Sequence, residues 1–238
     1  MESKILIFGA TGAVGSSLAK QMQNGKNKCH LIGKNEEEVS RLSDETGFSY
    51  SIIDVLEENF IEKIEQELSG FEISGIVYCI GSIDLKPLNL VSKKDVLKCF
   101  SLNLFPIYEI VKKFQTSLKK NKGSIVLFST VAVRQGFPNH SIISPVKASL
   151  EGLTVSLASE LSPNVRVNCI APSMSNSKMA SKILKNPKIA EGIAKQHPLK
   201  RLGEGKDSAA LAKFLLSDES SWITGQIIGV DGGRSNVG

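Results

Sequence analysis

A chain of 238 residues is long enough for one large α/β domain with a sizeable buried core, or for two small domains. Its hydrophobic fraction of 41% and charged fraction of 22% are typical of an ordinary soluble protein. The net charge of +5 comes from scattered lysines with little aromatic interleaving, which argues against nucleic-acid binding. No run approaches the roughly 18 apolar residues of a membrane span, and the four cysteines have no metal-ligand spacing. We therefore expect a cytoplasmic protein with reduced thiols, no bound metal and no membrane partner.

Short apolar runs rich in β-forming residues alternate with longer amphipathic segments along the chain. The predicted strands are 4–9, 29–33, 50–54, 75–80, 124–129, 165–171 and 226–232. The predicted helices lie near 14–23, 36–46, 57–69, 92–120, 145–161 and 206–217. This alternation predicts a doubly wound, Rossmann-type α/β fold, in which a parallel seven-stranded sheet has helices on both faces. No linker interrupts it, so residues 1–238 are expected to form a single domain, with a substrate-side loop and a short helix at about 172–198.

The stretch "FGATGAVGSSLA" follows the first predicted strand and opens the first helix. Gly9, Gly12 and Gly15 are spaced three apart, where a dinucleotide-binding chain must turn tightly and let a pyrophosphate approach its backbone. A tight turn without a ligand is the alternative, but the position between strand and helix favours a nucleotide. We predict that Gly9, Thr11, Gly12, Val14 and Gly15 bind the cofactor.

The end of the second predicted strand indicates which cofactor is used. An acidic residue there would accept a hydrogen bond from a free ribose 2'-hydroxyl, but the chain has Gly33 followed by Lys34. A cation favours a 2'-phosphate, so NADP is predicted, with NAD less favoured. The three glutamates at 36–38 are interpreted as first-turn helix residues behind an Asn35 cap. Asp54, after the third strand, is either an adenine contact or a loop-capping aspartate.

Three further stretches carry a resemblance that covers the whole chain. They are "RVNCIAP", "KASLEGLTVSLASEL" and "PLKRLGEGKDSAALAKFLLSDESSWITGQIIGVDGG" at residues 198–233. With the glycine turn they resemble the short-chain dehydrogenase/reductase family, and look most like the 3-oxoacyl-acyl-carrier-protein reductases. The resemblance implies an oxidoreductase that moves a hydride to or from a small carbonyl or alcohol substrate. It also implies a homotetramer or dimer built from the helices around 92–120 and 145–161.

The family's working residues can be placed one at a time on this chain. The resemblance implies that Thr130, or its neighbour Ser129, polarises the substrate carbonyl, and that Asn103 holds a water or the lysine's partner. Lys147 would be catalytic and would also bind the nicotinamide ribose, and Pro172 would lie beside the cofactor.

The stretch after the fourth strand departs from the family pattern. Where the family has Asn-Asn-Ala-Gly, this chain has "YCIG", which ends at Gly81. We still count Gly81 among the cofactor-binding residues.

The gravest departure lies four residues before Lys147. The family has a tyrosine there, whose phenol gives its proton to the carbonyl oxygen, and this chain has Ile143. Three readings stay open. His140, seven residues before Lys147, could donate the proton in an arrangement that resembles enoyl reductases. Alternatively Thr130, a water or the substrate handles the proton, or the chain is a non-catalytic NADP-binding subunit or sensor.

Overall fold

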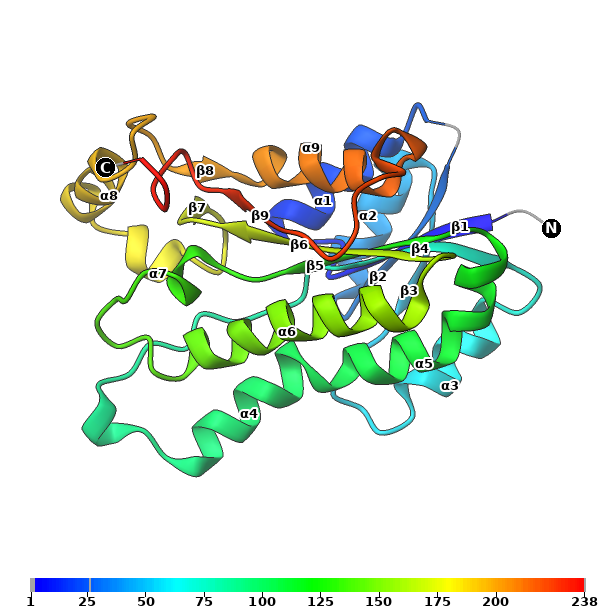
Figure 1. The fold of residues 1–238 in the computed structure, drawn as a ribbon, viewed down its shortest axis with the longest axis horizontal. Coiled ribbons are helices and arrows are strands. Elements are labelled where there is room, and N and C mark those ends of the chain that lie inside the picture. The colour runs from blue at the N-terminus through cyan, green and yellow to red at the C-terminus, as the bar shows by residue number, and fades with distance from the viewer. Residues whose placement is uncertain (1–2, 26, 238) are drawn as a thin grey trace.

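Seven parallel strands form one sheet between two layers of helices in the computed structural model, which describes residues 3–25 and 27–237 (Figure 1). The strand order is β3-β2-β1-β4-β5-β6-β9. The strands are β1 (Ser3–Phe8), β2 (Lys28–Gly33), β3 (Ser49–Ile52), β4 (Glu72–Tyr78), β5 (Ser124–Phe128), β6 (Arg166–Pro172) and β9 (Ile227–Val230). The order reverses between β1 and β4, and ligands of such sheets bind beyond the carboxyl ends of the strands at that point. The predicted fold class is confirmed.

The helices divide between the two faces of the sheet (Figure 1). One layer holds α1 (Ala13–Met22), α2 (Glu36–Thr46) and α9 (Gly205–Leu216). The other holds α3 (Phe60–Glu67), α4 (Lys93–Asn103), α5 (Phe105–Lys120) and α6 (Ile143–Leu161). Three short 3-10 helices, η1 (Leu88–Leu90), η2 (Val131–Val133) and η3 (Asp218–Ser220), lie in connections.

The single helix predicted over 92–120 is in fact two helices, α4 and α5, which meet at Leu104. Pro106 has no N–H to donate to the carbonyl of Leu102, so the helical hydrogen-bond ladder is interrupted there. The Tyr78 hydroxyl donates to that carbonyl oxygen at 2.7 Å. A side chain from β4 thus satisfies the acceptor that the proline leaves without its helical partner.

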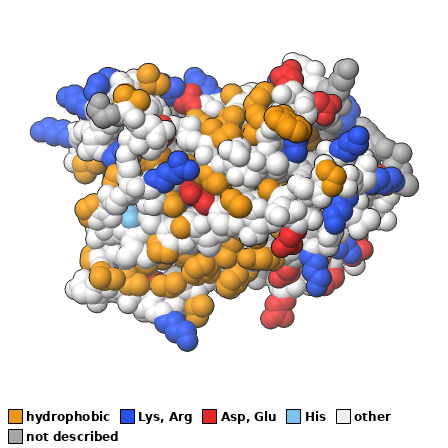
Figure 2. All heavy atoms as spheres, viewed as in Figure 1, with side chains coloured by type: hydrophobic (Ala, Val, Ile, Leu, Met, Phe, Trp, Pro, Cys, Tyr) orange, Lys and Arg blue, Asp and Glu red, His pale blue; other side chains and the backbone are white. Residues whose placement is uncertain are grey.

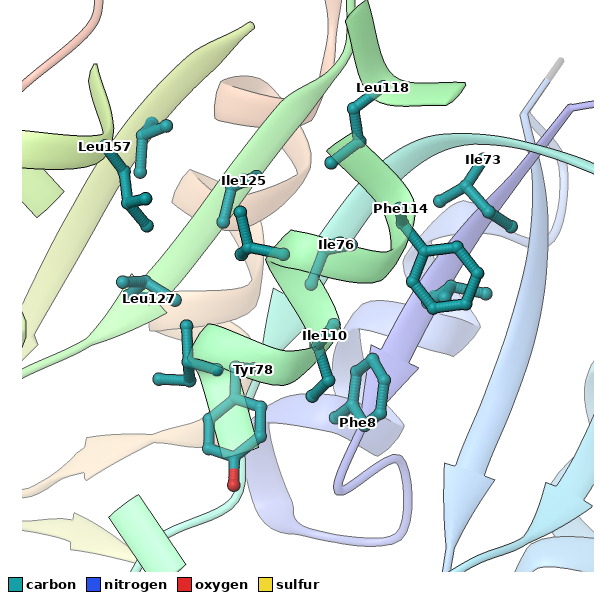
Figure 3. Close-up of a cluster of buried hydrophobic side chains, with 14 of the residues drawn as sticks. Phe8, Ile73, Ile76, Tyr78, Ile110, Phe114, Leu118, Ile125, Leu127 and Leu157 are labelled. Carbon is teal, nitrogen blue, oxygen red and sulfur yellow. The ribbon is translucent and has the colours of Figure 1, made fainter. Parts of the chain in front are cut away.

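Alternate residues of each central strand face opposite layers of helices. Leu6 and Phe8 of β1 pack into the core beneath α3, α5 and α6, whereas Ile5 and Ile7 pack into the core beneath α1, α2 and α9. Figure 3 shows the first core, where Phe8 and Tyr78 lie near Ile110 and Phe114 of α5. Burial on both faces explains why the strands read as continuous apolar runs.

The segment after β6 is more structured than the sequence predicted. It contains β7 (Ser175–Asn176), α7 (Ser181–Leu184) and α8 (Pro187–Lys195), where one short helix was expected. β7 pairs in parallel with β8 (Gly203–Glu204), so the segment is tied to the chain that leads into α9. Figure 1 shows it beyond the carboxyl ends of the strands. Within the described residues, no helix is long and apolar enough to cross a membrane.

Candidate active site

The glycine turn between β1 and α1 has the geometry of an anion cradle. Gly9 has a φ of 73°, in the left-handed region that favours glycine. A Cβ at Gly15 would lie 2.4 Å from the Gly9 carbonyl oxygen, so only glycine fits there. No side chain caps α1 at Gly12, and its first turn has no acidic residue. The positive end of the helix is therefore open to a phosphate group.

The other two residues predicted in this turn have different surroundings. Val14 is partly buried and packs against the core beneath α1, α2 and α9. The Thr11 side chain lies 3.8 Å from the position that a Cβ would take at Gly33. The hydrogen bond from Lys178 lowers the pKa of Glu38 below its usual range. A hydrogen bond from Thr11 to the same carboxylate lowers it further.

The end of β2 has no room for the acidic residue that NAD-binding chains use. A Cβ at Gly33 would lie 2.7 Å from Cγ2 of Val39, because α2 packs closely over the strand. Lys34 is largely exposed, and its Nζ lies 3.8 Å from the Asp54 carboxylate. Asp54 also accepts a hydrogen bond from the backbone N–H of Leu56 at 3.1 Å, which is the loop-capping role considered from the sequence.

Lys147 and Asn103 converge on the space above Gly81. A Cβ at Gly81 would lie 3.1 Å from Lys147 Nζ and 3.1 Å from Asn103 Oδ1. Lys147 Nζ donates to the Phe128 carbonyl oxygen at 3.0 Å, and the residue is only 7% exposed. Burial lowers the pKa of Lys147 to about 8. Asn103 Oδ1 is buried and has no hydrogen-bond partner among the described residues, so an acceptor points into the site unused.

A polar network that the sequence analysis missed continues from the Asn103 amide. Its Nδ2 donates to the Cys99 carbonyl oxygen at 2.9 Å and lies 3.2 Å from Ser82 Oγ. The Ser82 hydroxyl in turn donates to the Asp84 carboxylate. Burial, followed by a hydrogen bond with Asp84, raises the pKa of the Cys99 thiol to about 11. The available signal was the position of Ser82 and Asp84, directly after Gly81 at the carboxyl end of β4.

The two hydroxyls after β5 have different partners. Ser129 is buried and donates to Glu151 Oε1 of α6 at 2.7 Å. Thr130 is half-buried at the start of η2, where its Oγ1 accepts a hydrogen bond from the N–H of Ala132 at 3.3 Å. Because Thr130 Oγ1 is the acceptor in this bond, its hydroxyl proton can be donated to a substrate oxygen. Thr130 is therefore the better candidate for polarising the substrate carbonyl.

Ile143 begins α6 and is buried in a small apolar cluster with Cys99, Ile142 and Val146. The cluster packs against α4, which carries Cys99. The isoleucine side chain at this position cannot supply a proton. Ile143 lies one helical turn before Lys147 on α6.

His140 lies outside α6, in the loop that precedes it. Its Nδ1 is 2.8 Å from the Pro138 carbonyl oxygen, and its ring packs against Phe137. No hydrogen bond found among the described residues joins His140 to Lys147 or Thr130.

The last predicted site residue, Pro172, ends β6 and leads into the irregular segment. Beyond it, Lys178 forms an ion pair with Glu38 of α2. This contact joins the irregular segment to the start of α2, beside Thr11. In the part of the chain that the structure describes, no group of three or more histidine, cysteine or acidic residues could hold a metal ion.

Comparison with known proteins identifies the family. A family model described as "Enoyl-(Acyl carrier protein) reductase" matches residues 9–235. The chain belongs to the short-chain dehydrogenase/reductase family. It is 30% identical to a tropinone reductase homologue from Arabidopsis thaliana, over 96% of this chain and 90% of that protein. It is 29% identical to the 3-oxoacyl-[acyl-carrier-protein] reductase of Chlamydia muridarum, over 97% of this chain and 96% of that protein.

A solved structure of the same fold is that of ElxO with NADP bound. It superposes with a TM-score of 0.88 at 24% identity, and the match covers 98% of this chain and 99% of that chain. This short-chain dehydrogenase/reductase is thus an oxidoreductase, as the sequence predicted.

Proposed function

We propose that this short-chain oxidoreductase uses NADP(H) and moves a hydride to or from a small carbonyl or alcohol substrate, without a tyrosine as proton donor. The observation that carries the proposal is the convergence of Lys147 and Asn103 above Gly81, next to a glycine cradle at the start of α1. These groups lie where the strand order reverses, at the carboxyl ends of β1 and β4.

The residues present fit a dinucleotide. Gly9 and Gly15 leave the backbone bare where a pyrophosphate would approach, and the N-terminus of α1 is uncapped by any side chain. The buried Asn103 Oδ1 without a partner and the buried Lys147 ammonium supply an acceptor and donors for hydroxyl groups. When bound, the nicotinamide supplies or accepts the hydride.

The preference for the phosphorylated cofactor rests on Gly33 and Lys34. A Cβ at position 33 would lie 2.7 Å from Val39, which disfavours an acidic side chain there, and Lys34, the next residue, is exposed. Lys34 can exchange its distant contact with Asp54 for a phosphate, which binds a cation more strongly. The structure of ElxO, a protein of the same fold, has NADP bound, and this supports the choice of NADP over NAD.

At the reacting end, Thr130 and Lys147 have separate tasks. The Thr130 hydroxyl donates to the substrate carbonyl oxygen and polarises it. Among the residues that the structure describes, Lys147 Nζ has one hydrogen bond, to the Phe128 carbonyl oxygen, so its ammonium retains donors for the cofactor's ribose. Because Ile143 cannot act as an acid, the proton needs another source, and the loop position of His140 does not favour it.

We also infer that the protein is a homo-oligomer that buries the face formed by α4, α5 and α6. Figure 2 shows apolar side chains gathered where Figure 1 places α4 and α6. Leu97 of α4, Phe105 and Tyr108 of α5, and Val155 of α6 are all exposed. Large apolar patches of this kind mark association surfaces. The thiols of all four cysteines are unpaired, in keeping with the cytoplasmic location we propose.

Thermal unfolding tests the cofactor assignment. At equal concentration, NADPH should raise the melting temperature more than NADH, because a tighter ligand stabilises the folded state more. Lys34→Asp should reverse the order, and Lys119→Asp, an exposed substitution in α5, should leave it unchanged. Equal protection of the native protein by both cofactors would contradict the NADP assignment.

Turnover assays test the reaction. The native protein with NADPH should reduce at least one compound of a panel of small ketones, β-keto thioesters and enoyl thioesters. His140→Ala should keep that activity, since the His140 ring is hydrogen-bonded to the Pro138 carbonyl oxygen in the loop before α6. Loss of turnover with intact NADPH binding in His140→Ala would instead identify the histidine as the proton donor.

Light scattering tests the assembly. A dimer or tetramer is expected at micromolar concentration, and Val155→Asp should weaken it by placing a charge in the apolar face. A native monomer under those conditions would refute the proposed assembly.

A further inference from the structure

The turn that follows β9 fixes the position of Arg234. The Asp231 carboxylate accepts hydrogen bonds from the backbone N–H groups of Gly233 at 2.9 Å and of Ser235 at 3.0 Å. Gly232 and Gly233 have φ values of 63° and 87°, in the left-handed region that favours glycine. The backbone N–H of Arg234 donates to the Asp231 carbonyl oxygen at 3.2 Å. The tight turn therefore sets the direction in which the Arg234 side chain leaves the chain.

Arg234 joins two segments that lie beyond the carboxyl ends of the strands. Its Cζ lies 4.8 Å from the centre of the Phe137 ring, and its backbone carbonyl oxygen accepts from Gln135 Nε2 at 2.7 Å. Both partners belong to the loop between β5 and α6. Its Nη2 donates to Oε1 of Gln196, which directly follows α8. Figure 1 shows the chain after β9 running beside α8.

The loop beneath this cation carries Thr130 at its start. The backbone N–H of Gln135 donates to the Val131 carbonyl oxygen at 3.0 Å, so the chain after Thr130 is coiled and Gln135 stays close to it. Ser144 Oγ donates to the Ala132 carbonyl oxygen at 2.9 Å and holds the start of α6 against the same coil. We expect a substrate held by Thr130 to extend between this loop and the segment after β6, where the cation lies.

The guanidinium of Arg234 has no acidic partner among the described residues. The Asp231 carboxylate, which belongs to the same turn, is used by the backbone of that turn. Arg201, by contrast, forms an ion pair with Asp207. Arg234 is half-buried, and this burial lowers its pKa. Charges withdrawn from water are normally paired, so an anion from outside the chain would supply the missing partner.

We propose that Arg234 binds an acidic group of the substrate, so that the enzyme selects small carbonyl or alcohol compounds that carry a carboxylate or a phosphate. The proposal deepens the function proposed above and rests on it. A guanidinium has five N–H donors in a planar fork, and Gln196 accepts from one nitrogen of it. Stacking on Phe137 restrains the plane of the fork. The remaining donors can therefore meet two oxygens of one anion.

Arg134, in the same loop as Phe137, provides a contrast. Its side chain is exposed, and no hydrogen bond or ion pair joins it to another described residue. An exposed guanidinium keeps its hydration, so the absence of a partner costs little there. Arg134 therefore gives no reason to expect a bound anion, and it is a matched control for the loss of an arginine near the site.

Paired substrates test the selectivity. The native protein with NADPH is assayed on keto acids and keto phosphates, each beside its neutral methyl ester or alcohol analogue. In Arg234→Met the ratio of kcat/KM for the anionic compound to that for its neutral analogue should fall about tenfold to a hundredfold, because hydrogen bonds to a charged group are lost. Arg234→Lys keeps the charge without the fork and should lose part of the ratio. Arg134→Met should keep the native ratio.

A merely structural role of Arg234 would give a different result in this assay. A disturbed loop would lower kcat/KM for the anionic compound and for its neutral analogue alike, and their ratio in Arg234→Met would equal the native one. An unchanged ratio would therefore overturn the inference.

Thermal unfolding without cofactor tests the anion site separately from turnover. Native protein, Arg234→Met and Arg134→Met are heated in sodium malonate, sodium phosphate or sodium chloride at equal ionic strength. Malonate or phosphate should raise the native melting temperature above its value in chloride, because an anion that binds the folded state stabilises it. The glycine turn can also bind phosphate, so the measurement is the part of the gain that Arg234→Met removes. A malonate gain indicates a carboxylate substrate, and a phosphate gain alone indicates a phosphorylated one.

The outcomes separate this inference from the proposed function. A native enzyme that reduces the panel with the same ratio as Arg234→Met would overturn the role of Arg234 and leave the proposed function standing. A native protein that turns over no compound would refute the proposed function. In that case equal melting-temperature gains in native protein and Arg234→Met would overturn the anion site as well, whereas a gain lost only in Arg234→Met would support it.

Discussion

Replacement of Lys147 by methionine should stabilise the protein at neutral pH. Lys147 is 7% exposed, and burial lowers its pKa from 10.5 to about 8. The difference of about 2.5 pKa units corresponds to about 3 kcal/mol of unfavourable free energy for keeping the ammonium charged in the folded state. Methionine has a similar shape and no charge, but it loses the hydrogen bond to Phe128, worth about 1 kcal/mol. The net gain expected for Lys147→Met is about 2 kcal/mol at pH 7.

The pH dependence of this gain gives the decisive measurement. Between pH 8 and pH 10.5 the unfolded chain binds more protons at Lys147 than the folded protein does, so the native stability rises with pH. Urea unfolding of the native protein and of Lys147→Met is compared at pH 7 and pH 9.5, at one protein concentration. The advantage of the variant should shrink by about 2 kcal/mol between these pH values, which leaves the two proteins nearly equal.

A matched substitution controls for the loss of a lysine as such. Lys119 is exposed on α5, so Lys119→Met should differ from the native protein by a constant small amount at both pH values. If the free energies of unfolding of Lys147→Met and the native protein differed by the same amount at pH 7 and pH 9.5, burial of the charged ammonium would not destabilise the folded protein. That result would refute the reasoning.

Three other substitutions give further tests. Burial, aided by the charge of Lys4, lowers the pKa of His30 from 6.5 to about 4, so native stability should fall by about 3 kcal/mol as pH drops from 6.5 to 4; in chemical denaturation His30→Gln should lack this loss, and an identical decline in both would contradict it. Gly15→Ala places a Cβ 2.4 Å from the Gly9 carbonyl oxygen; it should destabilise the protein by about 1–3 kcal/mol and weaken NADPH binding in a fluorescence titration, and unchanged affinity would count against the cradle. Ile143→Tyr places a phenol one turn before Lys147 and should raise carbonyl reduction about tenfold or more; an inert variant that still binds NADPH would show that the phenol is not what the site lacks.

The fold could be predicted because its signals are local. Apolar runs, amphipathic segments and the glycine turn each lie within a few neighbouring residues, and the strand order follows from the parallel α/β pattern. The break between α4 and α5 was harder to foresee. Pro106 is visible in the sequence, but its interruption is compensated by Tyr78, a residue from β4 that meets the Leu102 carbonyl only in the folded chain.

The site was predicted only where the family pattern marks it. Lys147, Asn103 and Thr130 could be placed by their motifs, and the structure brings Lys147 and Asn103 together. The argument for His140 rested on its spacing from Lys147, which resembles that of enoyl reductases, and the structure has His140 in the loop before α6, which begins at Ile143. The contact between Ser82 and Asp84 matches no sequence motif. Its place in the polar network depends on Asn103 and Cys99, which come from a helix later in the chain.

The ion pair between Lys178 and Glu38 joins two parts of the chain that lie beside the glycine turn. It joins the irregular segment to α2, and the lysine side chain is largely exposed. Exposed ion pairs shift an equilibrium by about fivefold at most, and salt weakens them further. The ion pair therefore adds little to the pairing of β7 with β8, which also holds the segment. Cofactor exchange should become only a few-fold faster with rising ionic strength, because the backbone pairing of β7 with β8 does not depend on charge.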